Sequence, residues 1–240
     1  MTYCVGLLLN DGLVFLSDTR TNAGIDNISR YRKMFTWEVP GERSIVLMTA
    51  GNLAVTQAIV SLLEEGIADE EGSGIKSILA APTMFRIAEI VGEAALSVQD
   101  KYRDSLAQMK EQGGATMILG GQRAGGAPRL FLIYSAGNFI EATEDTPYLQ
   151  IGEHKYGKPI LDRVITPETS LDDAVKAVLL SMDSTLRSNL SVGMPLDLAV
   201  LPTDTCRISE RRRIEPEDEG FKALSDAWSQ SLRDAFSSIA

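Results

Sequence analysis

Residues 1–18, MTYCVGLLLNDGLVFLSD, decide the fold of this chain. They contain two apolar runs separated by Asn10-Asp11-Gly12, and an Asp-Gly pair between apolar runs is a strong signal for a β-hairpin. Ser17-Asp18 closes the second run. The sequence therefore opens with two antiparallel strands, and Asp18 ends the second of them.

Strand and helix signals alternate along the rest of the chain. Strands are predicted at 34–39, 44–49, 115–121, 129–135, 138–142 and 196–201, with a short one around Cys206–Ile208. Helices are predicted from the cap Asn52 to about Glu65, from Pro82-Thr83 onward, and from the capping box Ser170-x-x-Asp173 to 188. The glycine-rich segment 120–126 lacks the Gly-Lys-Ser/Thr of a phosphate loop and is interpreted as a turn. This order of elements predicts an α+β protein whose two sheets are covered by helices.

The C-terminal segment 211–240 is interpreted as a helical extension of the domain formed by residues 1–210. Its apolar residues recur at helical spacing and predict an amphipathic helix, with a stripe formed by Phe221, Leu224, Trp228, Leu232 and Phe236. The stripe is either an interface with another subunit or a face that packs on its own domain. The run Arg211–Arg213 precedes four acidic residues and is interpreted as a solvated face or a subunit contact.

Composition excludes several classes of protein. A net charge of −10 opposes binding to nucleic acid and to anionic membranes. One histidine and two distant cysteines offer no metal-ligand spacing, so no metal and no cofactor are expected. Cys4 and Cys206 are predicted to be buried free thiols in a reducing compartment. The N-terminus lacks an export signal and no apolar run approaches the ~20 residues of a membrane span, so a cytoplasmic location is expected.

The threonine at position 2 is the principal candidate for chemistry. Once Met1 is removed, Thr2 carries a free α-amine with a pKa of about 7.7–8.0, which can act as the base for its own hydroxyl without a histidine. Such a nucleophile also needs a nearby cation, a carboxylate that pairs with this cation, and a donor for the developing oxyanion. Lys33, Asp18 and the backbone N–H of Gly51 are the candidates for these three roles.

Together these residues resemble a known signature. Thr2…Ser17-Asp18-Thr19-Arg20-Thr21…Lys33…Thr49-Ala50-Gly51 is similar to that of proteasome β subunits and their bacterial relatives, among the N-terminal nucleophile hydrolases. The segment 187–193 resembles the active-site loop that follows in this family, and the resemblance covers about residues 2–202. Residues 17–24 and the extra C-terminal helix look most like the bacterial ancestral β-subunit (Anbu) group. The resemblance implies a four-layer αββα sandwich of two antiparallel sheets, with residues 1–210 as the hydrolase domain.

The resemblance also implies roles for individual residues. The expected catalytic set comprises the nucleophile, its supporting ion pair, the oxyanion donor and a serine that steadies the N-terminus: Thr2, Asp18, Lys33, Gly51 and Ser191. The expected substrate-binding residues are Thr21, Thr49 and Leu53, of which Thr49 corresponds to the floor of the primary specificity pocket. Arg20 is expected to have a structural hydrogen-bonding role.

The chain departs from the family pattern at three places. Lys33 lies one residue closer to the nucleophile than the family lysine, so Arg32 competes for its position. The family's late aspartate is Ser188 here, and Asp183 is a distant substitute for the missing charge. The family's Gly-Ser-Gly turn reads Gly152-Glu153-His154. The histidine of this turn either reaches the site or lies on the surface.

The expected function is that of a threonine-type peptidase, conditional on removal of Met1 by the cell's aminopeptidase. By resemblance its substrates are peptides or unfolded chains, and the protein forms a homo-oligomer, either a ring or an open helical assembly, with an ATPase as a possible partner. Two alternatives stay open at this point. One is a catalytically weak or silent self-assembling scaffold, and the other is an amidase that acts on non-peptide substrates.

Overall fold

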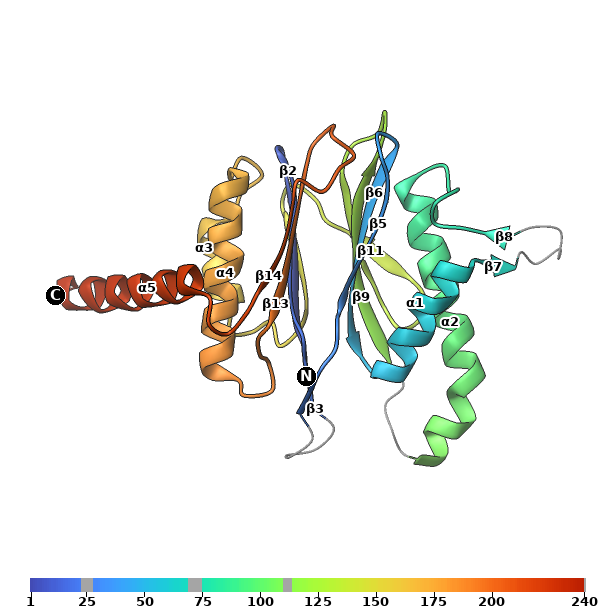
Figure 1. The fold of residues 1–240 in the computed structure, drawn as a ribbon, viewed down its shortest axis with the longest axis horizontal. Coiled ribbons are helices and arrows are strands. Elements are labelled where there is room, and N and C mark those ends of the chain that lie inside the picture. Colours follow the sequence, from blue (N-terminus) through green and yellow to red (C-terminus); the bar gives the residue numbers. More distant parts are fainter. Residues whose placement is uncertain (23–27, 69–74, 110–113, 240) are drawn as a thin grey trace.

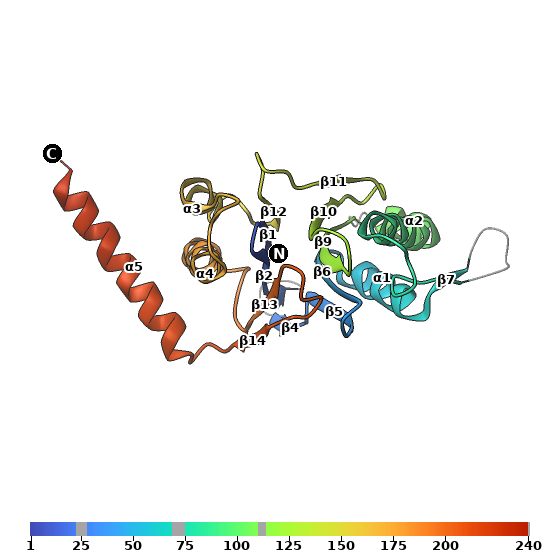
Figure 2. The same ribbon diagram turned by 90° about the horizontal axis from the view of Figure 1, so that it is seen from above.

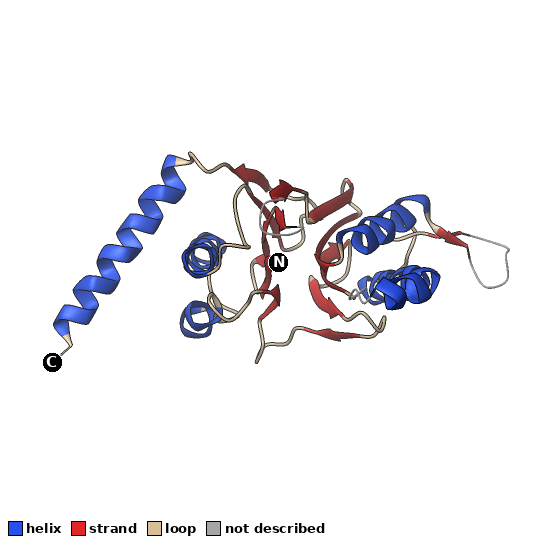
Figure 3. Cartoon of the chain, turned by 90° about the horizontal axis from the view of Figure 1, so that it is seen from below, coloured by secondary structure: helices blue, strands red, loops and turns tan. Residues whose placement is uncertain are grey.

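The computed structural model describes the chain except for residues 23–27, 69–74, 110–113 and 240, and the side chains of 22, 68 and 104–109. Two five-stranded antiparallel sheets lie face to face, and helices cover the outer face of each (Figures 1 and 2). Seen from below, the strands form the middle layers and the helices the flanks (Figure 3). The predicted four-layer αββα sandwich is therefore confirmed.

The first sheet carries the N-terminus. Its strand order is β12-β1-β2-β13-β14, with bounds Tyr148–Gly152, Tyr3–Leu9, Gly12–Asp18, Leu196–Pro202 and Glu210–Ile214. β1 and β2 form the predicted hairpin, in which Cys4 lies opposite Ser17. Antiparallel pairing therefore returns the end of β2 to the start of β1. This register places Asp18 beside the N-terminus.

The second sheet faces the first. Its strand order is β11-β10-β9-β6-β5, with bounds Phe139–Glu141, Arg129–Ile133, Ala115–Arg123, Arg43–Gly51 and Met34–Val39. Two short ribbons complete the strands: β3 (Arg20–Asn22) with β4 (Ile28–Arg30), and β7 (Ile67–Ala68) with β8 (Ile75–Lys76). Phe15 of the first sheet packs where Gly120 of β9 has no side chain, since a Cβ there would lie 2.6 Å from the Phe15 ring.

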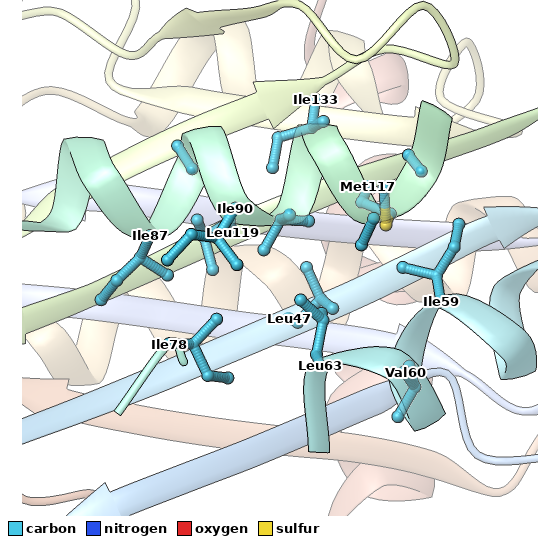
Figure 4. Packing of buried hydrophobic residues seen from close by; sticks show 14 of the residues in the cluster. Leu47, Ile59, Val60, Leu63, Ile78, Ile87, Ile90, Met117, Leu119 and Ile133 are labelled. Atoms are coloured by element: carbon cyan, nitrogen blue, oxygen red, sulfur yellow. The ribbon is translucent and has the colours of Figure 1, made fainter. Parts of the chain in front are cut away.

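The helices begin where their caps predict. α1 (Leu53–Glu65) starts after Asn52, whose side chain accepts from the backbone N–H of Ala54 and Val55. α2 (Met84–Met109) lies beside it, and both bury apolar residues against the second sheet, including Ile59, Leu63 and Ile87 over Leu47 and Leu119 (Figure 4). On the other side, α3 (Lys158–Val164) and α4 (Leu171–Ser188) cover the first sheet. No helix in the described parts of the chain is long and apolar enough to cross a membrane.

Two expectations differ from the structure, and some of its elements were not expected. The segment 120–126 is not entirely a turn, because β9 continues to Arg123. The short strand expected at Cys206–Ile208 is wrong: Cys206 has a positive φ of 44°, and the strand is β14 instead. β14 contains Arg211–Arg213 and forms the edge of the sheet, where charged side chains are tolerated. β12 and α3 were not predicted.

The C-terminal extension is shorter than residues 211–240, because the first four of these lie in β14 and pair with β13. The part that leaves the layered body is α5 (Glu219–Ser238), which projects away from it (Figures 1 and 2). Its apolar stripe divides in two. Phe221 and Leu224 pack against the core beneath α4, whereas Leu232 and Phe236 are 51% and 81% exposed.

Candidate active site

Thr2 precedes β1 and is held from two sides. Its carbonyl oxygen accepts from the backbone N–H of Glu153 at 2.7 Å, and the N–H of the next residue, Tyr3, donates to Asp18 Oδ1 at 3.1 Å. Gly152 makes the first contact possible, because a Cβ at this position would lie 1.9 Å from the Thr2 carbonyl oxygen. Thr2 is only 8% exposed. The start of the chain is therefore fixed between β2 and the end of β12.

A buried ion pair lies next to Thr2. Lys33 Nζ is 2.7 Å from Asp18 Oδ1, and the two side chains are 6% and 0% exposed. The same ammonium donates to the carbonyl oxygens of Arg20 at 2.6 Å and Met1 at 3.1 Å. All three of its protons therefore have an acceptor. Lys33, rather than Arg32, occupies the position beside Thr2.

Asp18 is surrounded by donors. Besides Lys33 and Tyr3, the backbone N–H groups of Arg20 and Gly193 donate to its Oδ2, each at 3.2 Å. Burial raises the pKa of the Asp18 carboxyl, while the charge and hydrogen bond of Lys33 and the backbone donors act against that rise. The hydrogen bonds favour the ionised carboxylate, which in turn compensates the buried charge of Lys33.

The N-terminal amine has a perturbed pKa. Burial lowers the pKa of the Met1 α-amine below 8.0, and the charge of Lys33 lowers it further, whereas Asp18 and Glu153 act in the opposite direction. A lowered pKa increases the fraction of neutral amine at neutral pH. The same surroundings would act on the α-amine of Thr2 once Met1 is removed, because this nitrogen lies one residue along the chain.

We expect the Met1 amine to titrate below 8.0 in the folded chain and near 8.0 in the chain unfolded by urea. Between these two pKa values the unfolded state binds more protons, so the free energy of unfolding rises with pH across this interval. This stabilisation is lost as the pH falls through the folded-state pKa. The pH dependence of acetylation of the amine, read by mass spectrometry of the N-terminal peptide, measures both values. Equal values in the two states would contradict the assignment.

A pocket of about 590 Å³ opens beside Thr2. It brings together most of the predicted site residues, which come from four separate parts of the fold: Thr2, Thr21, Lys33, Thr49, Gly51 and Leu53. Met1, Gly152 and Glu153 also line it. Asp18 lies behind Lys33 and is not part of the lining. The arrangement offers a hydroxyl, an amine, a paired ammonium and backbone donors within one cavity.

Other candidates lie elsewhere. Arg32 lines a different pocket, between β5 and β14, together with Asp197. His154 is exposed, and its Nδ1 lies 3.1 Å from the carbonyl oxygen of Gly152, so the surface interpretation is the one that agrees with the structure. Asp183 is buried but directed at α5, where it accepts from Ser225 Oγ at 2.7 Å. It therefore does not replace the charge that Ser188 lacks.

The contact expected between Ser191 and the N-terminus is not among the hydrogen bonds of the described residues. The Ser191 hydroxyl donates to Asn189 Oδ1 instead, which closes the loop after α4 on itself. The loop supports the site through its backbone, because Gly193 donates to Asp18 and Leu190 accepts from Arg20 Nη1 at 2.8 Å. The predicted structural role of Arg20 thus consists of holding this loop against the hairpin.

Potential metal ligands and the two cysteines were also considered as reactive groups of the described residues. The described residues contain no group of three or more His, Cys, Asp or Glu side chains that could hold a metal ion. Cys4 and Cys206 are both free and buried, as predicted. Burial raises the pKa of the Cys4 thiol far above its ordinary value, so this residue stays a thiol rather than a nucleophilic thiolate.

Sequence reasoning did not select Glu153. It is one of the residues that line the pocket, and its backbone N–H holds Thr2 in place. The signal was the departure from the family's Gly-Ser-Gly turn, where a charged residue stands in place of a small one.

Comparisons with known proteins agree with this geometry. The proteasome subunit family matches residues 2–201. An Anbu (Gly-1) mutant from Hyphomicrobium sp. strain MC1 is 51% identical, with 100% of this chain and 98% of that chain covered and a TM-score of 0.91. Anbu from Yersinia bercovieri is 46% identical, with coverage of 99% and 98% and a TM-score of 0.90.

A third structure, described as the helical assembly of the Anbu complex from Pseudomonas aeruginosa, is 47% identical, with coverage of 99% and 97% and a TM-score of 0.92. A comparison with curated proteins gives no match. The family match covers most of the chain, and the structural matches cover nearly all of it, including α5. The chain therefore belongs to the proteasome subunit family and is of the Anbu, or ancestral β-subunit, type.

Proposed function

We propose that this protein is a threonine-type peptidase in which Thr2, freed by removal of Met1, is the nucleophile. The observation that carries the proposal is the position of Thr2, which shares a pocket with Gly51 and with Lys33, whose ammonium is paired with the buried Asp18. A hydroxyl, its own α-amine and a fixed positive charge are the groups that this type of catalysis needs. Membership of the proteasome family supports the same reaction class.

The proposed reaction proceeds through an ester on Thr2. As Oγ1 bonds to the carbonyl carbon of the substrate amide, the hydroxyl proton passes to the α-amine of Thr2. The developing oxyanion accepts from the backbone N–H of Gly51. The amine then gives its proton to the leaving nitrogen, and the C–N bond breaks. Water hydrolyses the ester by the same route and restores the hydroxyl.

Lys33 supports this reaction as a fixed cation. With Met1 present, one proton of the ammonium is directed at the Met1 carbonyl oxygen. Removal of Met1 takes this acceptor away and leaves an N–H that can face the Thr2 hydroxyl and amine. A positive charge in this position lowers the pKa of both groups. The amine is then neutral more often, and the hydroxyl loses its proton more easily.

The acyl side of the substrate is assigned to the wall formed by Thr49 and Leu53, which come from β6 and the start of α1. Thr21 borders the same cavity from β3. A pocket wall formed by one leucine and threonine side chains would accept a medium-sized, mainly apolar side chain of the substrate. Peptides and unfolded chains are therefore the proposed substrates.

Covalent labelling tests the nucleophile. The full-length chain is prepared with Thr2 as its first residue and, separately, with Met1 retained, and each is incubated with a peptide epoxyketone. We expect one adduct, mapped to Thr2, on the first form and none on the second, because only a free α-amine can complete the reaction with this electrophile. Intact-mass spectrometry measures both. No adduct on the form without Met1 would favour the silent scaffold.

Self-assembly is the second part of the proposal. The relative from P. aeruginosa is described as a helical assembly, and the outer half of α5 presents apolar residues to solvent in the single chain. We propose that this half contacts another copy of the chain, in a ring or an open helical arrangement. Such a contact would remove the exposed Leu232 and Phe236 from water.

The double variant Leu232→Asp/Phe236→Asp is expected to shift the protein from the oligomer to the monomer, because two charges would have to be buried at the contact. Light scattering coupled to size exclusion measures the mass. The matched control is Ala223→Asp/Ala227→Asp, which adds the same charge to exposed positions on the opposite face of α5. An unchanged oligomer in the first variant would remove α5 from the interface.

A further inference from the structure

Glu153 places a carboxylate in the catalytic pocket that the reaction described above does not use. Glu153 is one of the residues that line the pocket, together with Thr2 and Gly51, and its side chain is only 15% exposed. Within the described residues its one ion pair is a 4.0 Å contact with Lys155 Nζ, whose side chain is 67% exposed. A contact of this length to a solvated side chain compensates little of the charge. A residue at the edge of the cavity therefore carries a carboxylate that is nearly uncompensated.

The formal charges of the ion pair beside the pocket sum to zero, although its cation lies nearer the cavity than its carboxylate. The ammonium of Lys33 is neutralised by Asp18 at 2.7 Å, and the α-amine of Thr2 must be neutral when it acts as a base. After removal of Met1, the remaining formal charge on the pocket lining is that of Glu153. The chain as a whole also carries a net charge of −10. The net negative charge of the chain and the carboxylate of Glu153 each attract a positively charged group, whereas Lys33 repels one placed next to it.

The α-ammonium of Met1 is a positive charge that already lies at this pocket. Met1 lines the same pocket, and its α-ammonium stands in for a cationic group of a substrate. Burial and the charge of Lys33 lower the pKa of this amine, whereas Asp18 and Glu153 raise it. The carboxylate of Glu153 thus stabilises a positive charge held inside the cavity, although it lies further than 4.0 Å from the amine in this arrangement.

Glu153 and the acyl-side wall come from different layers of the fold. Glu153 follows β12, which pairs with β1 in the first sheet, whereas Thr49 and Leu53 come from the second sheet and α1. A substrate whose acyl part contacts Thr49 and Leu53 would extend its leaving part toward the end of β12. Glu153 is therefore placed to contact the residue that follows the scissile bond.

We propose that Glu153 forms a cation subsite and that the favoured substrates are peptides with a positively charged group on the residue after the scissile bond. The inference rests on the proposed function and names the substrate class of the same site. Glu153 acts by charge and hydrogen bonding and takes up no proton in the reaction. A lysine or arginine side chain supplies the cation, and an N-terminal α-ammonium on the acyl side is the other source of the same chemistry.

The experiment uses quenched fluorescent peptides and full-length protein whose first residue is Thr2. Three peptides differ only in the residue after the scissile bond, which is lysine, norleucine or glutamate. A fourth carries lysine before the bond instead, and a fifth pairs a free N-terminal ammonium with norleucine after the bond. We expect kcat/KM to be about tenfold higher for lysine than for norleucine in the first series, with glutamate lowest.

Variants locate the effect. Glu153→Gln is expected to bring the lysine-to-norleucine ratio close to one, and Glu153→Lys to invert the order so that glutamate is preferred. Glu144→Gln removes the same charge from an exposed turn between β11 and β12 and is expected to keep the wild-type ratio. Thermal unfolding of each variant checks the fold, and the wild-type peptide series gives a result even if a Glu153 variant does not fold.

Each outcome bears on a different claim. Equal kcat/KM for lysine and norleucine in the wild type, or a preference that persists in Glu153→Gln, would overturn the cation subsite while leaving the peptidase intact. A preference confined to lysine before the bond or to the free N-terminal ammonium would overturn its placement on the leaving side. Hydrolysis of none of the peptides, together with no epoxyketone adduct, would overturn the proposed function and the subsite with it.

Discussion

Thr2→Ala is expected to abolish peptide hydrolysis, with a fall in kcat on the order of 10⁶-fold, as happens when the hydroxyl nucleophile of another hydrolase is removed. The methyl group of alanine cannot form the ester, although the amine, Lys33 and the pocket all remain. Loss of one small side chain at a site that is 8% exposed is expected to change the free energy of unfolding by no more than about 1 kcal/mol. Hydrolysis of a peptide library and thermal unfolding measure the two quantities.

Thr2→Ser is the matched control, because it keeps a hydroxyl beside the same amine. We expect this variant to retain hydrolysis and epoxyketone labelling at a reduced rate, and the oligomer to be the same in all three proteins. If wild type and Thr2→Ala hydrolyse the library equally slowly, the chain is a scaffold and not a peptidase.

Asp18→Ala is expected to destabilise the folded protein by about 3–5 kcal/mol, the cost of leaving a buried partner charge uncompensated. Lys33 would keep its ammonium in a place where its side chain is 6% exposed. The backbone donors of Tyr3, Arg20 and Gly193 would also lose their shared acceptor. Because these donors tie β1, β3 and the loop after α4 to the end of β2, the variant is expected to lose epoxyketone labelling as well. Urea unfolding measures the free energy.

Two control variants distinguish the effect of burial on the free energy of unfolding from the effect of losing a charge. Asp162→Ala removes the carboxylate of an exposed i,i+4 pair with Lys158, whose side chains are 48% and 47% exposed, and is expected to cost less than about 1 kcal/mol. The double variant Asp18→Ala/Lys33→Met removes both buried charges and is expected to be more stable than Asp18→Ala alone. An Asp18→Ala variant as stable as Asp162→Ala would show that the pair contributes little to folding.

Local sequence signals predict the features that depend on a single turn or a single helix end. The Asp-Gly turn fixes the β1–β2 hairpin, and the hairpin alone brings Asp18 back to the N-terminus. Asn52 caps α1 through purely local contacts, since its side-chain oxygen accepts from two N–H groups of the first turn. These features depend on residues close in sequence, so apolar periodicity and cap chemistry are enough to predict them.

The features that the sequence does not predict depend on contacts between residues far apart in the chain. The strand 148–152 is only five residues long, and its role becomes visible only when it pairs with β1. Sequence position alone cannot place Glu153 beside Thr2, because 151 residues separate them and the contact runs through the backbone. The edge strand at 210–214 contains three consecutive arginines, which local propensity assigns to solvent rather than to a sheet.

The hydrogen bond from Gly193 to Asp18 joins residues 175 positions apart in the chain. During synthesis at ~5–20 residues per second, this donor emerges about 10–35 seconds after Asp18. The N-terminus, by contrast, is among the first segments to leave the ribosome and is accessible to an aminopeptidase throughout that delay. Unmasking of the nucleophile can therefore precede completion of its surroundings. If the proposed function holds, a nascent chain would carry a bare threonine without cutting its neighbours, and competence would arrive only with the last strands of the first sheet.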